Sequence, residues 1–594
     1  MTAPRPKIIG STTSPLMAGA IGSLLVGFGV FYGGLQLAAR MDSGQWLRGG
    51  ANPGSALIYW VRDGARFGPS QIIAVAGLFL LVLIVFGLVL WMLGRRGRTR
   101  TPIDESAKYL GDSKVFTEAA IRKHAADAGL TTGEVVGLAV AVVVRTGQWF
   151  WAGFRDGMTC VMGPGSNKTT AVVIPLALDA PGPAWVTSNR PDVVAALYTS
   201  RQDKGRFWCF DPQRVADMPA TWYYDPLGYI RERPEEADTR SEELAQHFAS
   251  AGRPADARTD VFFDEAGRTL NACLLLAAAL DNQPITQVLQ WVSSRKNPRA
   301  VDILRQHDQI DSVKQLEGFA NLAADTANSI YQTAATQIRF LKNRSARAWV
   351  QRMGPDDDRP EFRPAEFVRS SGDLMVSLSR EGVGSFGPLI AAMTRATIKA
   401  AEDYAATRPN GRLPVPLVMP LDEVANVCRI HELPDLISHA GGRGIFLMPI
   451  VQSPAQGKAT WGADGWDKLW GASVIRLVGR GLIDTDFLEG ISKAIGDQDV
   501  QRVSHSKSSG RGGGSRSSNT GWTTERIMPV SKLVELPQKR AVVIAAGDRG
   551  ALLRLVPWFE RDEMRALVGA SQAAFVADHP SVELDDDPVA VDVA

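Results

Sequence analysis

Cysteine is scarce in this chain, and neither sign of charge dominates it. The 594 residues include only four cysteines, which lie far apart and form no C-x-x-C pair: Cys160, Cys209, Cys273 and Cys428. A disulfide framework or a zinc site is therefore not expected, and we predict reduced, mostly buried thiols. The 65 Lys and Arg residues nearly match the 63 Asp and Glu residues, for a formal net charge of +2. Because no global basic field exists, contact with nucleic acid would require local patches or a ring of subunits.

Long uncharged runs, in contrast, are present at the start of the chain, at residues 16–39 and 70–94. Each reaches the roughly 20 apolar residues that cross a bilayer as a helix. We therefore predict that residues 1–100 form a membrane anchor with two transmembrane helices in contact with lipid. A cleaved signal peptide is the alternative for the first run, but that run is too long and a second run follows it.

Arginines flank the second run and indicate an orientation. Arg95, Arg96, Arg98 and Arg100 follow it directly. By the positive-inside rule this end faces the cytoplasm. The chain is accordingly predicted to be a multi-pass protein of the bacterial inner membrane, with its bulk in the cytoplasm.

Short apolar runs alternate with helical segments beyond about residue 158, which favours an α/β fold on a largely parallel sheet. The predicted strands are Met158–Met162, Ala184–Thr187, Phe207–Phe210, Leu417–Leu421, Ile445–Val451, Val474–Leu477 and Ala541–Ala546. Residues 230–350 show almost no strand pattern and are predicted to be an inserted all-α domain. The α/β domain would then comprise residues 101–230 and 350–560, followed by a C-terminal segment, 561–594, with an acidic tail. Residues 504–524 are rich in Gly and Ser and are predicted to be a mobile loop, either a plain linker or a DNA-facing segment.

A glycine-bearing turn follows the first predicted strand and precedes a helical run. The turn consists of Gly163, Pro164, Gly165, Ser166, Asn167, Lys168, Thr169 and Thr170. A strand, such a turn, Lys-Thr and a helix form the layout of a P-loop, in which backbone N–H groups and the helix N-terminus hold phosphates. Lys168 is the candidate for the β- and γ-phosphates of ATP, and Thr169 is the candidate for Mg²⁺. A chance turn before a helix is the alternative interpretation.

The turn departs from the P-loop template at two points. Asn167 stands where the template has glycine, and Gly163 precedes Lys168 by five positions where the template has six. Asn tolerates left-handed backbone better than most residues, so the turn can keep its shape. The shortened loop leaves ATP turnover open.

An acidic pair, Asp422-Glu423, ends the apolar run Leu417–Leu421. Carboxylates at the carboxyl end of a buried strand are what a P-loop enzyme requires. Asp422 would reach Mg²⁺ directly or through water, and Glu423 would polarise the attacking water. The alternative is a solvated helix start with Asp422 as N-cap.

Two further polar residues flank the predicted strand Ile445–Val451. Gln452 follows the strand and could sense the γ-phosphate of ATP. Arg443 precedes it in a glycine-rich setting, and could act as an arginine finger that reaches the site of a neighbouring subunit. A surface arginine in a turn is the alternative for Arg443.

Several of these motifs occur in an order that resembles type IV secretion coupling proteins of the TraG/TraD kind. The resemblance rests on the stretches VMGPGSNKTTAVVIPLALDAPGPAWVTSNRPDVV, FDPQ, YDPL, PLDEVANVCRIHELPDLISHAGGRGIFLMPIVQS and WGADGWDKLWGASVIRLVGRGLIDTDFLEGISKAIGD. It implies a RecA-like P-loop NTPase domain with an all-α domain, preceded by two transmembrane helices and assembled as a homo-hexamer. It further implies ATP and Mg²⁺ as cofactors. The implied partners are DNA, single-stranded and carried with a relaxase, and components of the secretion channel.

The function predicted first is an ATPase that drives DNA or nucleoprotein transfer in conjugation. A docking receptor that recruits substrates without turning over ATP is the second hypothesis, supported by the degenerate loop. A double-stranded DNA pump of the chromosome-segregation type is the third.

Overall fold

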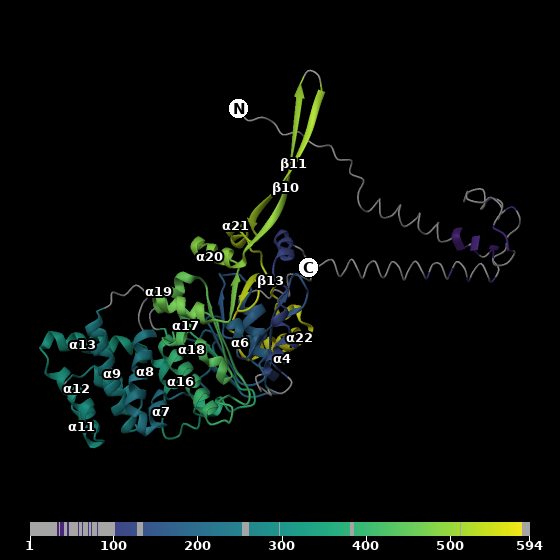
Figure 1. Cartoon of the computed structure of the whole chain (residues 1–594). Helices are drawn as coiled ribbons and strands as arrows, with labels where there is room; N and C mark the ends of the chain where they lie inside the picture. Colours follow the sequence, from purple (N-terminus) through teal and green to yellow (C-terminus); the bar gives the residue numbers. More distant parts are fainter. Residues whose placement is uncertain are drawn as a thin grey trace, which may run out of the picture. The chain divides into compact units, whose positions relative to one another are not determined.

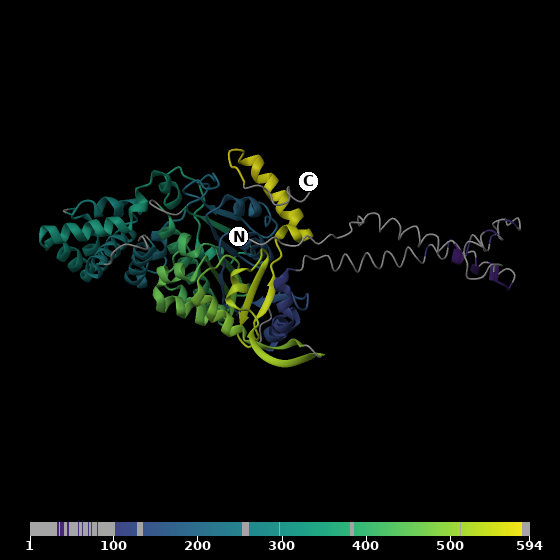
Figure 2. The same cartoon turned by 90° about the horizontal axis from the view of Figure 1, so that it is seen from above.

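The computed structural model describes residues 101–127, 135–251, 260–295, 297–380, 385–510 and 513–584, with scattered positions between 32 and 80. The chain forms two compact units, Met1–Thr101 and Pro102–Ala594. Most described positions of the first unit are helical. The second unit carries the sheet (Figures 1 and 2). All the candidate site residues belong to this unit.

Both predicted transmembrane helices belong to the first unit. Segments 16–39 and 70–94 lie for the most part outside the described residues. Among the positions that are described, no helix has the length and apolar character that a bilayer crossing requires. The predicted multi-pass location in the inner membrane is therefore wrong on this finding. The sequence argument inferred helices from the length of uncharged runs, whereas a crossing needs one continuous apolar helix.

A mixed sheet runs through the second unit and has 11 strands within the described residues, in the order β2-β1-β13-β12-β9-β3-β8-β7-β4-β6-β5. Neighbours from β9 to β5 are parallel, while β12, β13, β1 and β2 extend one edge with antiparallel pairing. The strands are β1 Gly137–Val143, β2 Trp149–Gly153, β3 Met158–Val161, β4 Ala184–Ser188, β5 Phe207–Phe210, β6 Leu374–Leu378, β7 Leu417–Leu421, β8 Ile445–Val451, β9 Ile475–Gly479, β12 Arg540–Ala545 and β13 Ala551–Arg554.

The strand predictions are confirmed where the site is built. Strands β5, β7 and β8 have the predicted bounds, and β3, β4, β9 and β12 differ from them by one or two residues at an end. Strands β1, β2, β6 and β13 were not predicted. A short apolar run such as β1, GLAVAVV, has no period that separates a buried strand from a buried helix, so its type is ambiguous from sequence alone.

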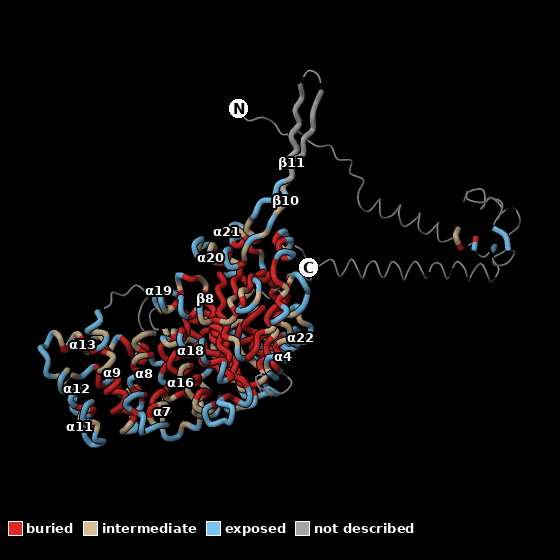
Figure 3. Tube along the Cα trace, viewed as in Figure 1, coloured by how far each residue is buried: buried red, intermediate tan, exposed pale blue. Residues whose placement is uncertain are grey.

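Helices cover both faces of the sheet and divide its core into two clusters. On β4, Trp185 belongs to one cluster, and its neighbours Ala184 and Val186 belong to the other, because successive strand residues point to opposite faces. The face of Ala184 is covered by the π-turn η3 (Thr169–Val173), α5 (Ile174–Asp179), α6 (Pro191–Leu197) and α22 (Asp562–Asp578). Figure 3 shows the buried residues concentrated between these layers.

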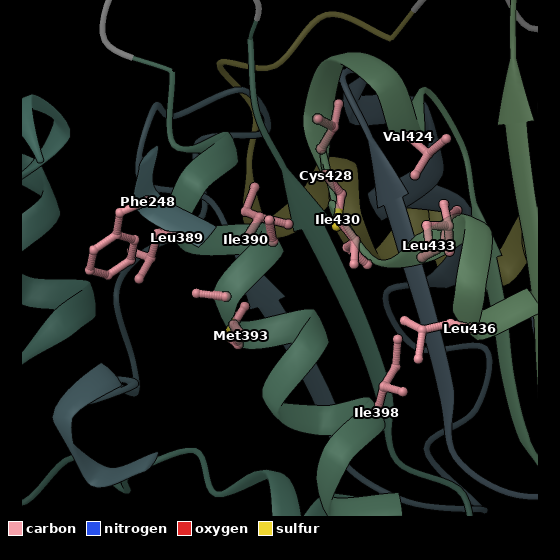
Figure 4. Close-up of a cluster of buried hydrophobic side chains, with 14 of the residues drawn as sticks. Phe248, Leu389, Ile390, Met393, Ile398, Val424, Cys428, Ile430, Leu433 and Leu436 are labelled. Carbon is pink, nitrogen blue, oxygen red and sulfur yellow. The ribbon is translucent and has the colours of Figure 1, made fainter. Parts of the chain in front are cut away.

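The opposite face is covered by α16 (Gly387–Ala406) and the helices that follow β7. Figure 4 shows Leu389, Ile390, Met393 and Ile398 of α16 against apolar side chains from residues 424–436, with Phe248 from α8 (Ala237–Ala251) beside them. The remaining helices on this side are α17 Val424–Val427, α18 Leu433–His439, α19 Pro454–Ala472, α20 Thr485–Ile495 and α21 Val530–Val534. The Asp484 side chain caps helix α20 by accepting a hydrogen bond from the Phe487 N–H at 3.0 Å.

Between β5 and β6 the described chain forms helices and connecting turns, with no strand of the sheet (Figure 1). The helices are α7 Pro226–Arg231, α8 Ala237–Ala251, α9 Val261–Leu280, α10 Thr286–Val292, α11 Arg299–Gln306, α12 Ile310–Asn321, α13 Ala324–Gln337, α14 Arg344–Val350 and α15 Pro364–Phe367. Helix α9 lies at the centre and contacts α7, α8, α10, α11, α12 and α13. The division of the chain into named domains stays a prediction.

A long antiparallel hairpin replaces the loop predicted at residues 504–524. It pairs β10 (Asp497–Gly510) with β11 (Gly513–Arg526) in continuous register and projects from the second unit (Figure 1). The loop prediction was wrong because two antiparallel strands satisfy each other's backbone groups. Pairing of that kind needs no apolar core. The loop was predicted because the segment lacks the apolar residues that would form one.

Candidate nucleotide site

The predicted site residues gather at the carboxyl ends of three adjacent parallel strands. The turn 163–170 follows β3, the pair Asp422-Glu423 follows β7, and Gln452 follows β8, and these strands lie in the order β3-β8-β7. Because the carboxyl ends of parallel strands meet at one edge of the sheet, segments about 250 residues apart in sequence come together there.

Gly163 begins the turn and lies against a second glycine that the sequence analysis did not identify. A Cβ on Gly163 would lie 2.6 Å from the carbonyl oxygen of Gly481, and Gly481 itself has φ +90°. The Gly163 N–H donates to the carbonyl oxygen of Arg480 at 2.9 Å. Two glycines are therefore needed to bring the start of the turn against the segment that follows β9.

The rest of the turn keeps a left-handed residue at the position where the template has glycine. Asn167 has φ +63°, as expected for an Asn that substitutes for that glycine, and Gly165 has φ +66°. The helix that follows opens with the π-turn Thr169–Val173, closed by a hydrogen bond from the Ile174 N–H to the Thr169 carbonyl oxygen. The turn 163–170 is one residue shorter than the P-loop template. The first helical turn after it contains one residue more than a turn of α-helix. Turns of this type are frequent at functional sites.

Two polar atoms of the turn have no hydrogen-bond partner among the described residues. Ser166 Oγ and Asn167 Oδ1 are buried, and neither is hydrogen-bonded. Thr170 donates through its hydroxyl to the Asn167 carbonyl oxygen at 3.4 Å and lines the same pocket. Buried polar groups are nearly always satisfied, so these orphaned atoms indicate that the turn is shaped for a ligand.

Lys168 lies between the two carboxylates of the acidic pair. Its ammonium contacts Glu423 Oε1 and lies 3.5 Å from Asp422 Oδ1. Burial by itself would lower the pKa of Lys168, but the charges of Asp422 and Glu423 outweigh it and raise that pKa. The lysine is therefore held fully charged at the position where phosphates are expected.

Asp422 is coupled to the hydroxyl predicted to share its metal ion. Thr169 Oγ1 donates to Asp422 Oδ2 at 2.9 Å, and the Thr187 hydroxyl donates to the Asp422 carbonyl oxygen at 2.6 Å. Asp422 is only 2% exposed, and burial raises the pKa of its carboxyl above 3.8 although Lys168 opposes the shift. The alternative of a solvated helix cap is excluded, because Asp422 is buried and the residue before α17 is Glu423.

Glu423 is held by two amide side chains, one after β7 and one after β8. Gln452 Nε2 lies 2.8 Å from each of its carboxylate oxygens, and Asn426 Nδ2 donates to Oε2 at 3.2 Å. Its own backbone has φ +52°, a left-handed conformation that a non-glycine residue rarely adopts. Strain of this kind persists where the surroundings over-determine it, which is common at functional sites.

A second layer of amides, also missed by the sequence analysis, supports this arrangement. Gln456 Nε2 donates to Asn426 Oδ1, and Gln456 Oε1 accepts from the Gln452 N–H, both at 2.9 Å. The signal in the sequence is spacing: Asn426 lies one helical turn after Glu423, and Gln456 lies one turn after Gln452.

Arg443 is the one predicted site residue that lies elsewhere. It precedes β8, so the seven-residue strand separates it from Gln452, a distance of about 23 Å at roughly 3.3 Å per residue. Its guanidinium is 2.6 Å from Glu402 Oε1, and its side chain is 44% exposed. Arg443 therefore does not reach the site of its own chain, and a role across a subunit boundary stays a prediction.

The turn and the acidic pair form one wall of a pocket of about 1140 Å³. The other wall comes from the C-terminal part of the chain, which the sequence analysis did not assign to the site. That wall contains Gln538, Trp558, Gly569, Gln572, Ala573, Val576 and Leu584.

The donor set of the pocket suits Mg²⁺ held together with phosphates. The described residues contain no group of three or more His, Cys, Asp and Glu side chains that could hold a metal ion by themselves. Mg²⁺ is usually bound through one or two carboxylates plus substrate phosphates. Asp422 and Thr169 supply that partial ligand set, beside the amino end of the helix that follows the turn.

The chain is similar to several proteins of conjugative transfer. The family described as the TraM recognition site of TraD and TraG matches residues 416–538, the stretch that contains Asp422, Glu423 and Gln452. A conjugal transfer protein TraG of Agrobacterium fabrum is 22% identical over 423 residues, or 69% of this chain. The chain resembles the type IV coupling proteins. The resemblance predicted from sequence is thereby confirmed.

Further matches agree in kind. A probable conjugal transfer protein TraG of Sinorhizobium fredii is 22% identical over 420 residues, 68% of this chain. The matched regions span only 61% of the Agrobacterium relative and 62% of the Sinorhizobium relative. Among solved structures, the plasmid coupling protein TrwB in complex with ADP and Mg²⁺ is similar at a TM-score of 0.48 and 16% identity, covering 72% of this chain and 91% of TrwB.

Proposed function

We propose that this coupling protein binds ATP with Mg²⁺ at the turn 163–170 and hydrolyses it. The observation that carries the proposal is the convergence of Lys168, Thr169, Asp422, Glu423 and Gln452 through hydrogen bonds and ion pairs at one edge of the sheet. In this proposal the α/β unit works as a RecA-like P-loop NTPase. The helical block between residues 230 and 350 is its inserted all-α domain.

Each residue has a distinct task in the proposed reaction. The N–H groups of residues 165–170 and the Lys168 ammonium bind the phosphates of ATP. Bound Mg²⁺ would neutralise charge on the β- and γ-phosphates. Asp422 and Thr169 hold that ion. Glu423 accepts a hydrogen bond from the attacking water and orients it, while Gln452 keeps the Glu423 carboxylate in place and senses the γ-phosphate.

Glu423 has to exchange its partner before it can act. In the structure its Oε1 contacts Lys168, which is the group that phosphates would engage. Binding of a polyanion at Lys168 would compete for that ammonium and leave the Glu423 carboxylate to the water. The hydrogen bonds from Gln452 and Asn426 keep its position meanwhile.

The proposed process is the transfer of DNA, single-stranded and with its relaxase, to a type IV secretion channel in conjugation. The names of the curated relatives support this proposal. Assembly as a homo-hexamer would bring Arg443 of one subunit toward the site of the next, where it could stabilise charge in the transition state.

Hydrolysis of ATP by the full chain, measured with and without single-stranded and double-stranded DNA, tests the proposal. We expect single-stranded DNA to stimulate activity that is lost in Lys168→Ala. Thr170→Ser is the matched control, because the hydroxyl that contacts Asn167 is kept. Preferential stimulation by double-stranded DNA would favour the pump of the chromosome-segregation type.

The docking receptor without ATP turnover remains the second candidate, because the turn is one residue short and has Asn167 in place of glycine. Absence of hydrolysis together with absence of ATP binding in the wild-type chain would favour it. In that case the Lys168–Glu423 contact would be a purely structural ion pair.

A further inference from the structure

Helix α22 is fixed to the sheet domain by one of its faces. Met564, Val568, Ser571 and Phe575 are buried and recur at helical spacing, so they form one stripe. The Ser571 hydroxyl donates to the Ala195 carbonyl oxygen of α6 at 2.8 Å and accepts from the Thr199 N–H at 3.0 Å. The helix therefore has a defined rotation relative to α6.

This rotation turns the adjacent stripe of α22 toward the pocket above the phosphate-binding turn. Gly569, Gln572, Ala573 and Val576 all line that pocket and lie at positions i, i+3, i+4 and i+7, which share one helix face. A Cβ on Gly569 would meet nothing within 4 Å. The pocket is thus open directly beside the helix.

The lining contributed by the C-terminal part of the chain is chemically different from the lining at the turn. Its apolar side chains include Trp558, Val576 and Leu584, and Trp558 is almost fully buried in the core. Lys168, Asp422 and Glu423 line the other part. One continuous pocket thus joins a charged part to an apolar part, as expected of a site for a ligand with a charged end and a flat apolar end.

Two amide side chains complete the apolar part. Gln538 and Gln572 line the pocket, and neither side chain has a hydrogen bond within the described part of the chain. A glutamine amide offers one donor and one acceptor side by side. That pair complements the N6 amino group and N7 of adenine, whereas O6 and N7 of guanine both require donors.

We infer that α22, together with Trp558 and Gln538, forms the nucleobase subsite of the pocket, and that Gln572 makes it selective for adenine. The inference rests on the proposed function, since the triphosphate on the turn 163–170 directs the base toward α22. The volume of about 1140 Å³ is slightly above the roughly 300–1,000 Å³ typical of small-molecule sites. A whole nucleoside triphosphate can therefore be accommodated.

Binding of three probes to the full chain tests the inference: ATP, GTP and inorganic tripolyphosphate, each with Mg²⁺, by calorimetry. Tripolyphosphate reports on the turn alone, and the difference between it and ATP reports on the base subsite. Gly569→Phe should fill the subsite and reduce ATP affinity to that of tripolyphosphate, which itself should bind as in the wild type. Gly490→Phe, at an exposed position of α20 outside the pocket, is the matched control and should bind ATP normally, since its Cβ meets open space. Gln572→Ala should weaken ATP roughly tenfold, leave GTP nearly unchanged and remove the preference.

Separate results would overturn the two proposals. If wild-type chain binds tripolyphosphate but ATP binds no tighter, or if Gly569→Phe binds ATP as the wild type does, the base does not lie against α22. If wild-type chain binds neither ATP nor tripolyphosphate, the proposed nucleotide site fails and the subsite fails with it. Equal affinity for ATP and GTP in the wild type would remove the role of Gln572 in selectivity.

Discussion

Replacement of Lys168 by Met should destabilise the nucleotide-free protein, because two buried carboxylates lose the cation between them. Asp422 and Glu423 are 2% and 4% exposed, and the Lys168 side chain is 12% exposed. Removal of one member of a buried charge cluster leaves uncompensated charge and costs about 3–5 kcal/mol. Met has similar volume, so little of this loss would come from a cavity. We expect a loss near the lower end of that range, about 3 kcal/mol, because Gln452 and Asn426 still donate to Glu423.

The loss should depend on pH in a defined direction. Burial raises the folded pKa of Asp422 above the value of 3.8, while Lys168 lowers it. Between the unfolded and folded pKa values the native state holds more protons, so stability falls as pH rises through that window. Without Lys168 the folded pKa of Asp422 rises further and the window extends upward. The deficit of Lys168→Met should therefore be larger at about pH 8 than at about pH 5. The folded pKa of Lys168 is raised above 10.5, so the wild-type lysine stays charged at both pH values.

Urea denaturation of the full chain at both pH values, followed by tryptophan fluorescence, measures the free energy of unfolding of Lys168→Met and of the wild type. Lys493→Met is the matched control: that exposed lysine lies 3.6 Å from Glu489, and its loss should cost less than about 1 kcal/mol. The double variant Lys168→Met with Glu423→Gln should regain part of the stability, because one of the two charges is gone. A Lys168→Met protein as stable as the wild type, or equally destabilised at both pH values, would refute the reasoning.

Three further predictions concern the turn, the second layer and the thiols. Gly163→Ala should weaken nucleotide binding at least tenfold, because its Cβ would lie 2.6 Å from the Gly481 carbonyl oxygen. Gly442→Ala is the control and should leave nucleotide binding unchanged, because its Cβ meets nothing within 4 Å. Calorimetric titration of both variants with ATP measures the difference. Asn426→Ala should lower the hydrolysis rate about tenfold at unchanged ATP affinity, since it holds only one oxygen of Glu423; a change confined to affinity in steady-state kinetics would contradict this. All four cysteines are buried, and burial raises the pKa of Cys428 to about 12. A thiol reagent such as DTNB should therefore label the four cysteines only after denaturation. Rapid labelling of the native chain would count against the core described above.

The strands around the site could be predicted from sequence because buried parallel strands are short apolar runs that end in polar residues. Leu417–Leu421 followed by Asp422-Glu423, and Ile445–Val451 followed by Gln452, contain both signals. The hairpin 497–526 could not be predicted, because its strands pair with each other and carry no apolar period. The contribution of α22 to the pocket also could not be predicted, since only the packing of Ser571 against α6 determines which face of the helix meets the turn.

The contact of Gly163 with Gly481 could not be predicted from the sequence for a similar reason. A glycine required by close approach resembles a glycine in any turn until the approaching segment is known. The predicted multi-pass location failed differently, because an uncharged run is necessary for a crossing helix and is insufficient to establish one.

The comparison of Glu423→Gln with the wild type tests the central claim most directly, with ATP affinity and the hydrolysis rate measured on the same preparation. Glu423 should orient water without binding phosphate. We therefore predict ATP affinity within about threefold of the wild type and hydrolysis slowed by roughly a hundredfold or more. Hydrolysis by Glu423→Gln at the wild-type rate would contradict the account.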